Sequence, residues 1–198
     1  MKNKGLLVFG LAVAAIVIVA LIFGGIYNSL VQAEEKVSES WAQVENVYQR
    51  RLDLTPNLVE AVKGYAAHEK GTLDAVIEAR SKATQVNISP KAFNSPEALT
   101  QFEQIQQGLS SALSRLLVVI EQYPDLKANQ NFLALQSQLE GTENRIAVER
   151  RRFNEVARDF NTQLRSFPNN VVARWMGLKR KSYFAADEGA RVAPKIKF

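Results

Sequence analysis

The chain has 198 residues, of which 46% are apolar and 23% are charged, and its formal net charge at pH 7 is +5. It has no cysteine and one histidine, which excludes a disulfide framework, a thiolate metal site, a cysteine nucleophile and a multi-histidine metal site. The apolar fraction is too high for a disordered chain, and no stretch alternates as a strand would. We therefore expect an all-α protein.

A short basic end, residues 1–4, precedes an uncharged apolar run over residues 5–26. As a helix this run would be roughly 33 Å long, enough for a hydrocarbon layer of about 30 Å. A cleaved signal peptide is the alternative, but such peptides carry apolar runs of only about 7–15 residues. We therefore predict a retained transmembrane anchor, which includes Leu6, Leu7, Val8, Phe9, Ile16, Val17, Ile18, Leu21, Ile22 and Phe23.

The charges that flank the apolar run predict its orientation. Lys2 and Lys4 precede it, whereas residues 34–36 carry two glutamates and one lysine. Basic flanks stay on the cytoplasmic side of a membrane. We therefore expect a single-pass protein of the bacterial inner membrane with a cytoplasmic N-terminus and an exported remainder.

Two pairs of small residues lie within the predicted anchor, Gly10 with Ala14 and Ala20 with Gly24. Small residues at this spacing let two membrane helices pack closely. Such pairs also arise by chance in spans rich in alanine and glycine, so a helix that faces only lipid is the plainer interpretation.

The first helix beyond the anchor is expected to continue directly from it. Apolar residues recur in one seven-residue phase at Leu30, Val37, Val44, Leu58 and Tyr65. Pro56 interrupts this run, and the preserved phase favours a kink there over a reversal of the chain. We expect this helix to reach about Gln85, before the longest loop, residues 85–94 with Pro90.

Two further helices are predicted. The second begins at Ser95-Pro96-Glu97, which offers an N-cap, a proline in the first turn and an acidic residue, and it ends before Tyr123-Pro124-Asp125. The third has the heptad spacing of a coiled coil over roughly 37 residues and stops at Phe167-Pro168. Its packing stripe comprises Phe132, Leu139, Ile146, Phe153, Phe160 and Phe167.

These helices predict an antiparallel bundle of three to four long helices over residues 27–167. With a kink at Pro56, residue 167 lies far from the anchor; with a reversal, the chain returns to the bilayer. Arg51, Glu149 and Gln163 interrupt the apolar stripes, and single polar core positions of this kind set helix register in some proteins.

The C-terminal tail, residues 168–198, contains seven basic and two acidic residues interleaved with aromatic ones. This composition suits an anionic membrane surface. The alternative is a tail that packs on the bundle with its basic groups solvated. A nucleic-acid partner is not expected, because an exported, tethered domain would rarely meet one. The candidates for assembly or membrane contact are Arg174, Trp175, Leu178, Lys179, Arg180 and Lys181.

Several segments resemble the LemA family, over about Tyr27 to Phe198. They include Tyr27-Asn28, Trp41-Ala42-Gln43-Val44, Asp53-Leu54-Thr55-Pro56-Asn57, Tyr123-Pro124-Asp125-Leu126, Leu139-Glu140-Gly141-Thr142-Glu143-Asn144 and Ala185-Ala186-Asp187-Glu188-Gly189. The chain departs from the family at Phe153-Asn154 and Phe160-Asn161, where relatives often have Tyr-Asn pairs. The resemblance implies a single-pass bacterial membrane protein with a helical bundle and no established enzymatic activity.

Candidate chemistry is sparse. His68-Glu69 suggests a catalytic or metal site, but no second ligand lies one helical turn away, so a structural or surface histidine is the favoured interpretation. The chain has no glycine-rich phosphate loop and no HExxH helix. We therefore expect no catalytic residues, no metal and no cofactor; an enzyme would need a pocket with converging polar groups near His68.

Two functions are consistent with these features. The favoured one is a non-enzymatic, self-assembling scaffold at the bacterial cell envelope, with the lipid bilayer and further copies of the chain as its partners. The alternative is an envelope sensor or adaptor that binds and regulates a membrane protein partner.

Overall fold

The computed structural model describes residues 2–85 and 95–185 and is built from helices. The prediction of an all-α protein is confirmed, since no strand occurs within these two ranges. The predicted loop 85–94 and the tail after residue 185 lie largely outside the described residues. The helices are α1 (Lys2–Lys63), α2 (Lys70–Gln85), α3 (Pro96–Ile120), α4 (Pro124–Lys127), α5 (Gln130–Arg165) and α6 (Asn169–Trp175).

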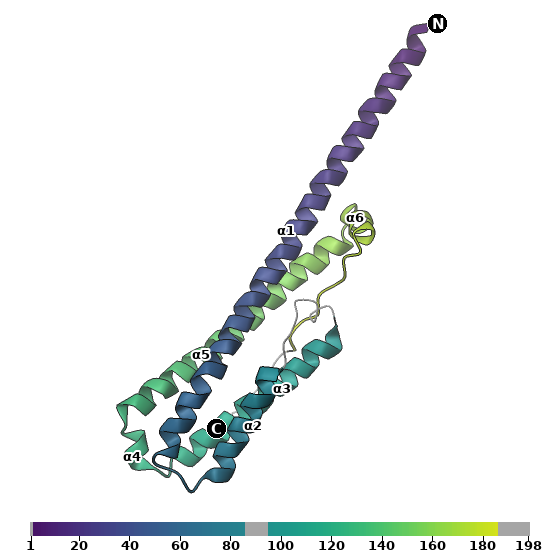
Figure 1. Ribbon diagram of the computed structural model, residues 1–198. Coiled ribbons are helices and arrows are strands. Elements are labelled where there is room, and N and C mark those ends of the chain that lie inside the picture. The colour runs from purple at the N-terminus through teal and green to yellow at the C-terminus, as the bar shows by residue number, and fades with distance from the viewer. Residues whose placement is uncertain (1, 86–94, 186–198) are drawn as a thin grey trace, which may run out of the picture.

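α1 is one unbroken helix, and its N-terminal part projects well beyond the other helices (Figure 1). This projecting part is long and apolar enough to cross a membrane, and none of its apolar window is buried against the rest of the protein. The first bundle helix therefore continues directly from the apolar segment, as the sequence predicted.

The helix passes Pro56 without reversing because a neighbouring helix satisfies the carbonyl that this proline leaves free. A proline has no N–H to donate to the carbonyl four residues earlier, here that of Leu52. Arg80 of α2 donates its Nε–H to this oxygen at 2.9 Å. The hydroxyl of the buried Thr55 donates to the carbonyl of Arg51 at 2.8 Å, which adds a further bond beside the proline.

The chain reverses instead at residues 64–69, so the expectation of one helix from the anchor to Gln85 is wrong. Glycine at position 64 disfavours helix continuation, and Ala66 closes the last turn by donating to the carbonyl of Val62 at 2.8 Å. Tyr65, placed in the apolar stripe by its spacing, is 47% exposed. The bundle consequently has four long helices.

With this reversal, α1 and α3 run away from the apolar segment, whereas α2 and α5 run back toward it (Figure 1). The start of α3 is as predicted: the Ser95 hydroxyl accepts a hydrogen bond from the Ala98 N–H at 3.3 Å. At the end of α5 the chain has returned to the level of the apolar segment, where the rings of Phe23 and Trp175 lie 5.5 Å apart.

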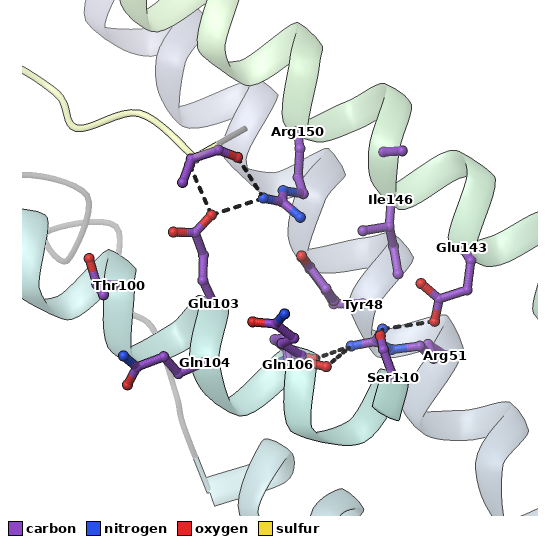
Figure 2. A pocket seen from close by; sticks show the side chains of 13 residues that line it. Tyr48, Arg51, Thr100, Glu103, Gln104, Gln106, Ser110, Glu143, Ile146 and Arg150 are labelled. Atoms are coloured by element: carbon purple, nitrogen blue, oxygen red, sulfur yellow. Dashed lines mark hydrogen bonds and ion pairs between the residues drawn. The ribbon is translucent and has the colours of Figure 1, made fainter. Parts of the chain in front are cut away.

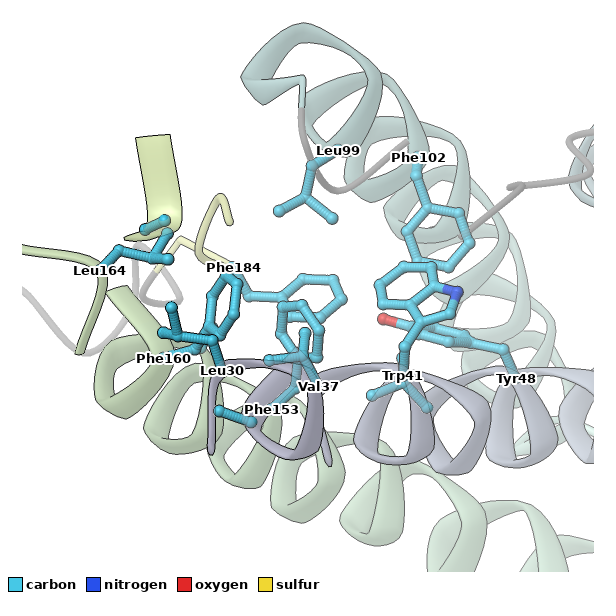
Figure 3. Close-up of a cluster of buried hydrophobic side chains, with 14 of the residues drawn as sticks. Leu30, Val37, Trp41, Tyr48, Leu99, Phe102, Phe153, Phe160, Leu164 and Phe184 are labelled. Carbon is cyan, nitrogen blue, oxygen red and sulfur yellow. The ribbon is translucent and has the colours of Figure 1, made fainter. Parts of the chain in front are cut away.

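The core is divided into two clusters along the bundle axis. The cluster nearer the apolar segment, which we call the anchor-side core, includes Trp41, Phe102, Phe153 and Phe160 (Figure 3). The far cluster begins at Leu52 and extends to the reversal. Five members of the predicted α5 stripe are buried, whereas Phe167 follows the end of α5 and is 84% exposed, because the helix stops at Arg165.

We expect the role of Arg80 to depend on Pro56. Arg80→Met should lower the free energy of unfolding by about 1 kcal/mol, because the Leu52 carbonyl loses its donor. In a Pro56→Ala background the same change should cost less, because the restored N–H at position 56 can bond that carbonyl. Thermal unfolding of the four variants of the full chain in mild detergent, followed by circular dichroism, measures this coupling; equal costs in both backgrounds would contradict it.

Candidate functional site

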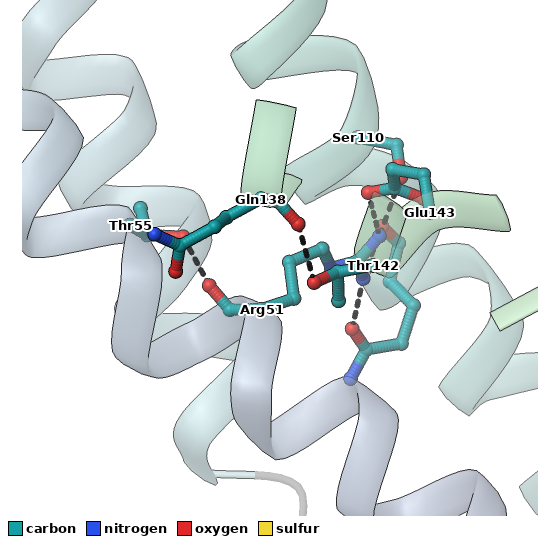
Figure 4. A network of polar contacts seen from close by, with 7 residues as sticks. Arg51, Thr55, Ser110, Gln138, Thr142 and Glu143 are labelled. Carbon is teal, nitrogen blue, oxygen red and sulfur yellow. Dashed lines mark hydrogen bonds and ion pairs between the residues drawn. The ribbon is translucent and has the colours of Figure 1, made fainter. Parts of the chain in front are cut away.

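A buried arginine lies between the two clusters. The side chain of Arg51 on α1 is 1% exposed, and its guanidinium bonds to residues of two other helices, α3 and α5. It donates to the Ser110 hydroxyl at 2.7 Å, to the Glu143 carboxylate at 2.8 Å and to the side-chain oxygen of Gln106 (Figures 2 and 4). Burial of a charge is costly unless it is paired and hydrogen-bonded, and these partners offset much of that cost, although the Arg51 Nε–H is buried without a partner. Arg51 thereby ties α1 to α3 and α5.

A cleft of about 440 Å³ opens beside this arginine (Figure 2). A second ion pair crosses it, with the Arg150 guanidinium 2.9 Å from the Glu103 carboxylate. Burial raises the pKa of the Tyr48 phenol, which also faces the cleft, to about 12. The charged groups of the cleft bind one another, so the two ion pairs join α1 to α5 and α3 to α5.

His68 lies apart from this cleft, exposed on the turn between α1 and α2. The neighbouring Glu69 accepts a hydrogen bond from the Tyr123 hydroxyl at 3.0 Å, so it joins this turn to the end of α3. Among the described residues, no group of three or more histidine and acidic side chains is placed to hold a metal ion.

Two asparagines on α5 bind the tail backbone as it returns along the bundle. Asn161 donates its amide N–H to the Lys181 carbonyl at 2.9 Å and accepts from the Lys181 N–H at 2.8 Å. Asn154, seven residues earlier, makes the same pair of bonds to Phe184 at 3.0 and 2.8 Å. Each amide group thus pairs with one residue as a neighbouring strand would. We call this arrangement the tail clamp.

The clamp directs two tail side chains inward. The Phe184 ring stacks on the indole of Trp41 at 5.8 Å and meets Phe153 edge-on at 5.5 Å. The Lys181 ammonium lies 2.9 Å from the Glu34 carboxylate of α1, with the Phe160 ring 5.2 Å away. The described part of the tail, residues 168–185, therefore packs on the bundle, as the alternative to membrane contact expected. The prediction of Lys181 as a surface contact is wrong, because its side chain is 4% exposed.

Other tail residues lie outward. Leu178 is partly buried against the anchor-side core, so it contributes mainly to packing. Arg174, Trp175, Lys179 and Arg180 are exposed, and the predicted stripe residue Phe167 lies on the same part of the chain. The apolar anchor residues are likewise exposed, Phe23 least at 36% because it contacts Trp175.

The clamp residues were missed in the sequence, although a signal for them was present. The two Phe-Asn pairs repeat at a seven-residue interval, which places both asparagines on one edge of α5, beside the buried rings. Of the three polar positions noted in the stripes, only Arg51 joins a network that crosses the core. The buried Thr142 lies beside this network on α5 and donates its hydroxyl to the carbonyl of Gln138 at 2.7 Å (Figure 4).

The fold and these sites define a class: a helical bundle whose first helix begins with a segment long enough to span a membrane. The chain belongs to the LemA family, whose model matches residues 40–198. It is 26% identical over 171 residues to Protein LemA of Metamycoplasma hominis, a match that covers 86% of this chain and 74% of that protein.

The chain is also similar to two proteins named as magnetosome proteins. It is 26% identical over 174 residues to Magnetosome protein MamQ of Magnetospirillum gryphiswaldense and to Magnetosome protein MamQ 1 of Paramagnetospirillum magneticum. Each match covers 80% of this chain and 64% of the relative, so the chain spans just under two thirds of the length of these proteins.

The hydrogen-bond network around Arg51 predicts that loss of Glu143 destabilises the protein more than loss of Arg51 does. Glu143→Leu leaves the buried guanidinium without a carboxylate and should cost on the order of 3–5 kcal/mol. Arg51→Met should cost less, because Glu143 is 39% exposed and can be hydrated. Unfolding of both variants in mild detergent measures the difference; a greater cost for Arg51→Met would show that the arginine stabilises mainly by packing.

The tail clamp predicts protection of one cleavage site. Asn161→Ala removes three hydrogen bonds, two to the Lys181 backbone and one to the Tyr183 hydroxyl. At about 1 kcal/mol each, their loss should make the tail open on the order of a hundredfold more often. Trypsin should then cut faster after Lys181, measured by mass spectrometry of the fragments. Asn144→Ala, the same change at an exposed position of α5, is the control and should leave the rate unchanged. An unaltered rate in Asn161→Ala would contradict the clamp.

Proposed function

We propose that the protein is a non-enzymatic, self-assembling scaffold, anchored in the bacterial inner membrane by residues 5–26 with its bundle on the exported side. The observation that carries this proposal is the continuity of α1. One helix runs from the apolar segment into the bundle with no intervening loop. A bundle joined to its anchor in this way keeps a set orientation to the membrane, which suits a structural element.

Packing supports a rigid junction between anchor and bundle. Leu30, the fourth residue after the apolar run, is already fully buried, and Val37 and Trp41 follow on the same face of α1. The ion pair from Lys181 to Glu34 adds a contact just beyond the membrane boundary. A hinge at this boundary would have to break these contacts.

The route of assembly that we favour is through the anchor. The buried heptad residues of α5 pack within the protein, so they are not free to bind another copy. Gly10, Ala14 and Ala20 are exposed and Gly24 is partly exposed, and nothing lies within 4 Å of where a side chain at Gly10 or Gly24 would begin. Helical spacing places these two glycines on roughly one face, which suits close packing of two spans.

The comparisons and the polar contacts also favour a structural role. Neither Protein LemA nor the MamQ proteins are named for a reaction. The charged groups of the cleft pair with one another across the helices. The orientation with a cytoplasmic N-terminus rests on Lys2 and Lys4, which precede the apolar run.

An envelope adaptor is the second candidate. The same two glycines that favour self-assembly would equally accept the span of a membrane protein partner, since nothing lies within 4 Å of where their side chains would begin. The two candidates therefore differ in what covers this face of the anchor.

The mass of the full chain in a mild detergent, measured by light scattering, tests the proposal. A discrete multiple of 22.1 kDa is expected. Replacing both Gly10 and Gly24 by Ile should lower that mass toward the monomer. Ala12→Ile is the control, because two positions along a helix lie roughly 200° apart and this residue therefore occupies the opposite face from Gly10. A monomeric parent would overturn self-assembly and favour the adaptor. Cross-linking in cells would then recover the partner protein of that adaptor.

A further inference from the structure

We propose that α6 and its flanks form a second contact with the membrane, in the headgroup region of the leaflet where the anchor emerges. Phe167, Val171 and Trp175 would enter the interface, and the exposed basic residues beside them would bind anionic lipid headgroups. This inference rests on the anchoring proposed above and names the surface by which the bundle meets the bilayer.

The position of Trp175 along the anchor carries the argument. Its ring contacts that of Phe23 at 5.5 Å, and Phe23 lies three residues before the end of the apolar run at Ile26. At 1.5 Å per residue, the contact is therefore roughly 5 Å inside the boundary of the span. Tryptophan is enriched at this depth of a membrane, where its ring meets both acyl chains and headgroups.

The apolar side chains here are unusually exposed for a helix that is otherwise packed. One face of α6 is fixed to the bundle through Val172 and Ala173, which are both buried. The opposite face carries Val171 and Trp175, which are 60% and 72% exposed. Phe167, four residues before Val171, is 84% exposed. In Figure 1, α6 lies beside α1 at the end of the bundle from which the apolar segment projects.

Charge supports the same partner. Arg174, Lys179 and Arg180 are exposed on the same stretch of chain as the apolar residues. Lys181 does not belong to this group, because Glu34 binds its ammonium. Basic side chains next to a membrane are attracted to anionic lipids, and an apolar face rimmed by them is typical of interfacial helices.

The bilayer is favoured over a second copy of the chain as the occupant of this surface. The contact between Phe23 and Trp175 links the surface directly to the segment that would be embedded in lipid. Lipid thus surrounds these side chains as soon as the anchor is inserted, whereas another protein would first have to displace it.

The two tryptophans of the chain allow a direct test. The full-length protein is reconstituted in vesicles of phosphatidylcholine and phosphatidylglycerol whose acyl chains carry bromine, a short-range quencher, near the headgroup. Trp41 is 1% exposed and lies roughly 27 Å along α1 from Phe23, beyond the reach of the bromine. Bromine should quench Trp175. Brominated vesicles should therefore lower the fluorescence of the parent protein by most of the amount that the Trp175→Phe substitution removes. The fluorescence of Trp175→Phe itself should be the same in brominated and unbrominated vesicles.

A matched pair of variants tests the apolar face. Val171→Asp should reduce the quenching of Trp175 severalfold, because a carboxylate would be drawn out of the interface. Val118→Asp is the control, because Val118 is 69% exposed but lies on the last turn of α3, at the end of the bundle opposite the apolar segment. At that end, the Tyr123 hydroxyl bonds Glu69 of the turn between α1 and α2. The quenching in Val118→Asp should equal that of the parent. Replacing Arg174 and Arg180 by Glu should remove the added quenching that phosphatidylglycerol confers over phosphatidylcholine alone.

The outcomes separate this inference from the proposal beneath it. If the protein floats with the vesicles but brominated lipid leaves the emission unchanged, the second membrane contact is overturned and anchoring stands. If the protein does not float with the vesicles, both fail. If Trp175 is unquenched and its emission shifts to shorter wavelength as the ratio of protein to lipid rises, another copy of the chain covers the surface and the inference is overturned.

Discussion

The buried guanidinium of Arg51 is the constraint from which the arrangement of the bundle follows. Its partners lie on α3 and α5, so the three helices can shift along one another only by stranding a cation in the core. This sets the axial register in which Trp41 meets Phe102 and Phe153, roughly one to three helical turns nearer the apolar segment. This register therefore determines the positions of the anchor-side core and of the tail residues that pack on it.

A second arginine maintains the straight course of α1. Pro56 frees a carbonyl within the bundle, and Arg80 binds it from α2, so the helix continues past a residue that would otherwise bend or end it. The Leu52 carbonyl and the Arg51 guanidinium of α1 are therefore bound by side chains of other helices. In consequence, the last two turns of α1 stay in line with the part of the helix that packs nearer the apolar segment.

The sequence predicted the helices better than their connections or their polar contacts. Apolar spacing identified α3 and α5, because a buried helical face repeats in a regular way. It also suggested continuity through residues 64–69, where the preserved phase concealed a reversal that a glycine and the docking of α2 produce. The pair of Lys181 with Glu34 joins residues 147 positions apart, and no local pattern can indicate it. The clamp asparagines had a local pattern, but their role appears only once the tail lies beside them.

The return of the tail gives the basic and aromatic residues a meaning that composition alone could not. Part of the tail belongs to the core, since the Phe184 ring packs on both Trp41 and Phe153, which also contact each other. The clamp on one side and the end of α5 on the other then hold α6 at a fixed height on the bundle. Because α6 is held at both ends, it cannot move away from the bundle toward a membrane. Its exposed side chains can therefore contact lipid only if α1 holds the bundle close to the bilayer surface. The two uses of the tail, packing and surface display, are thus parts of one arrangement rather than alternatives.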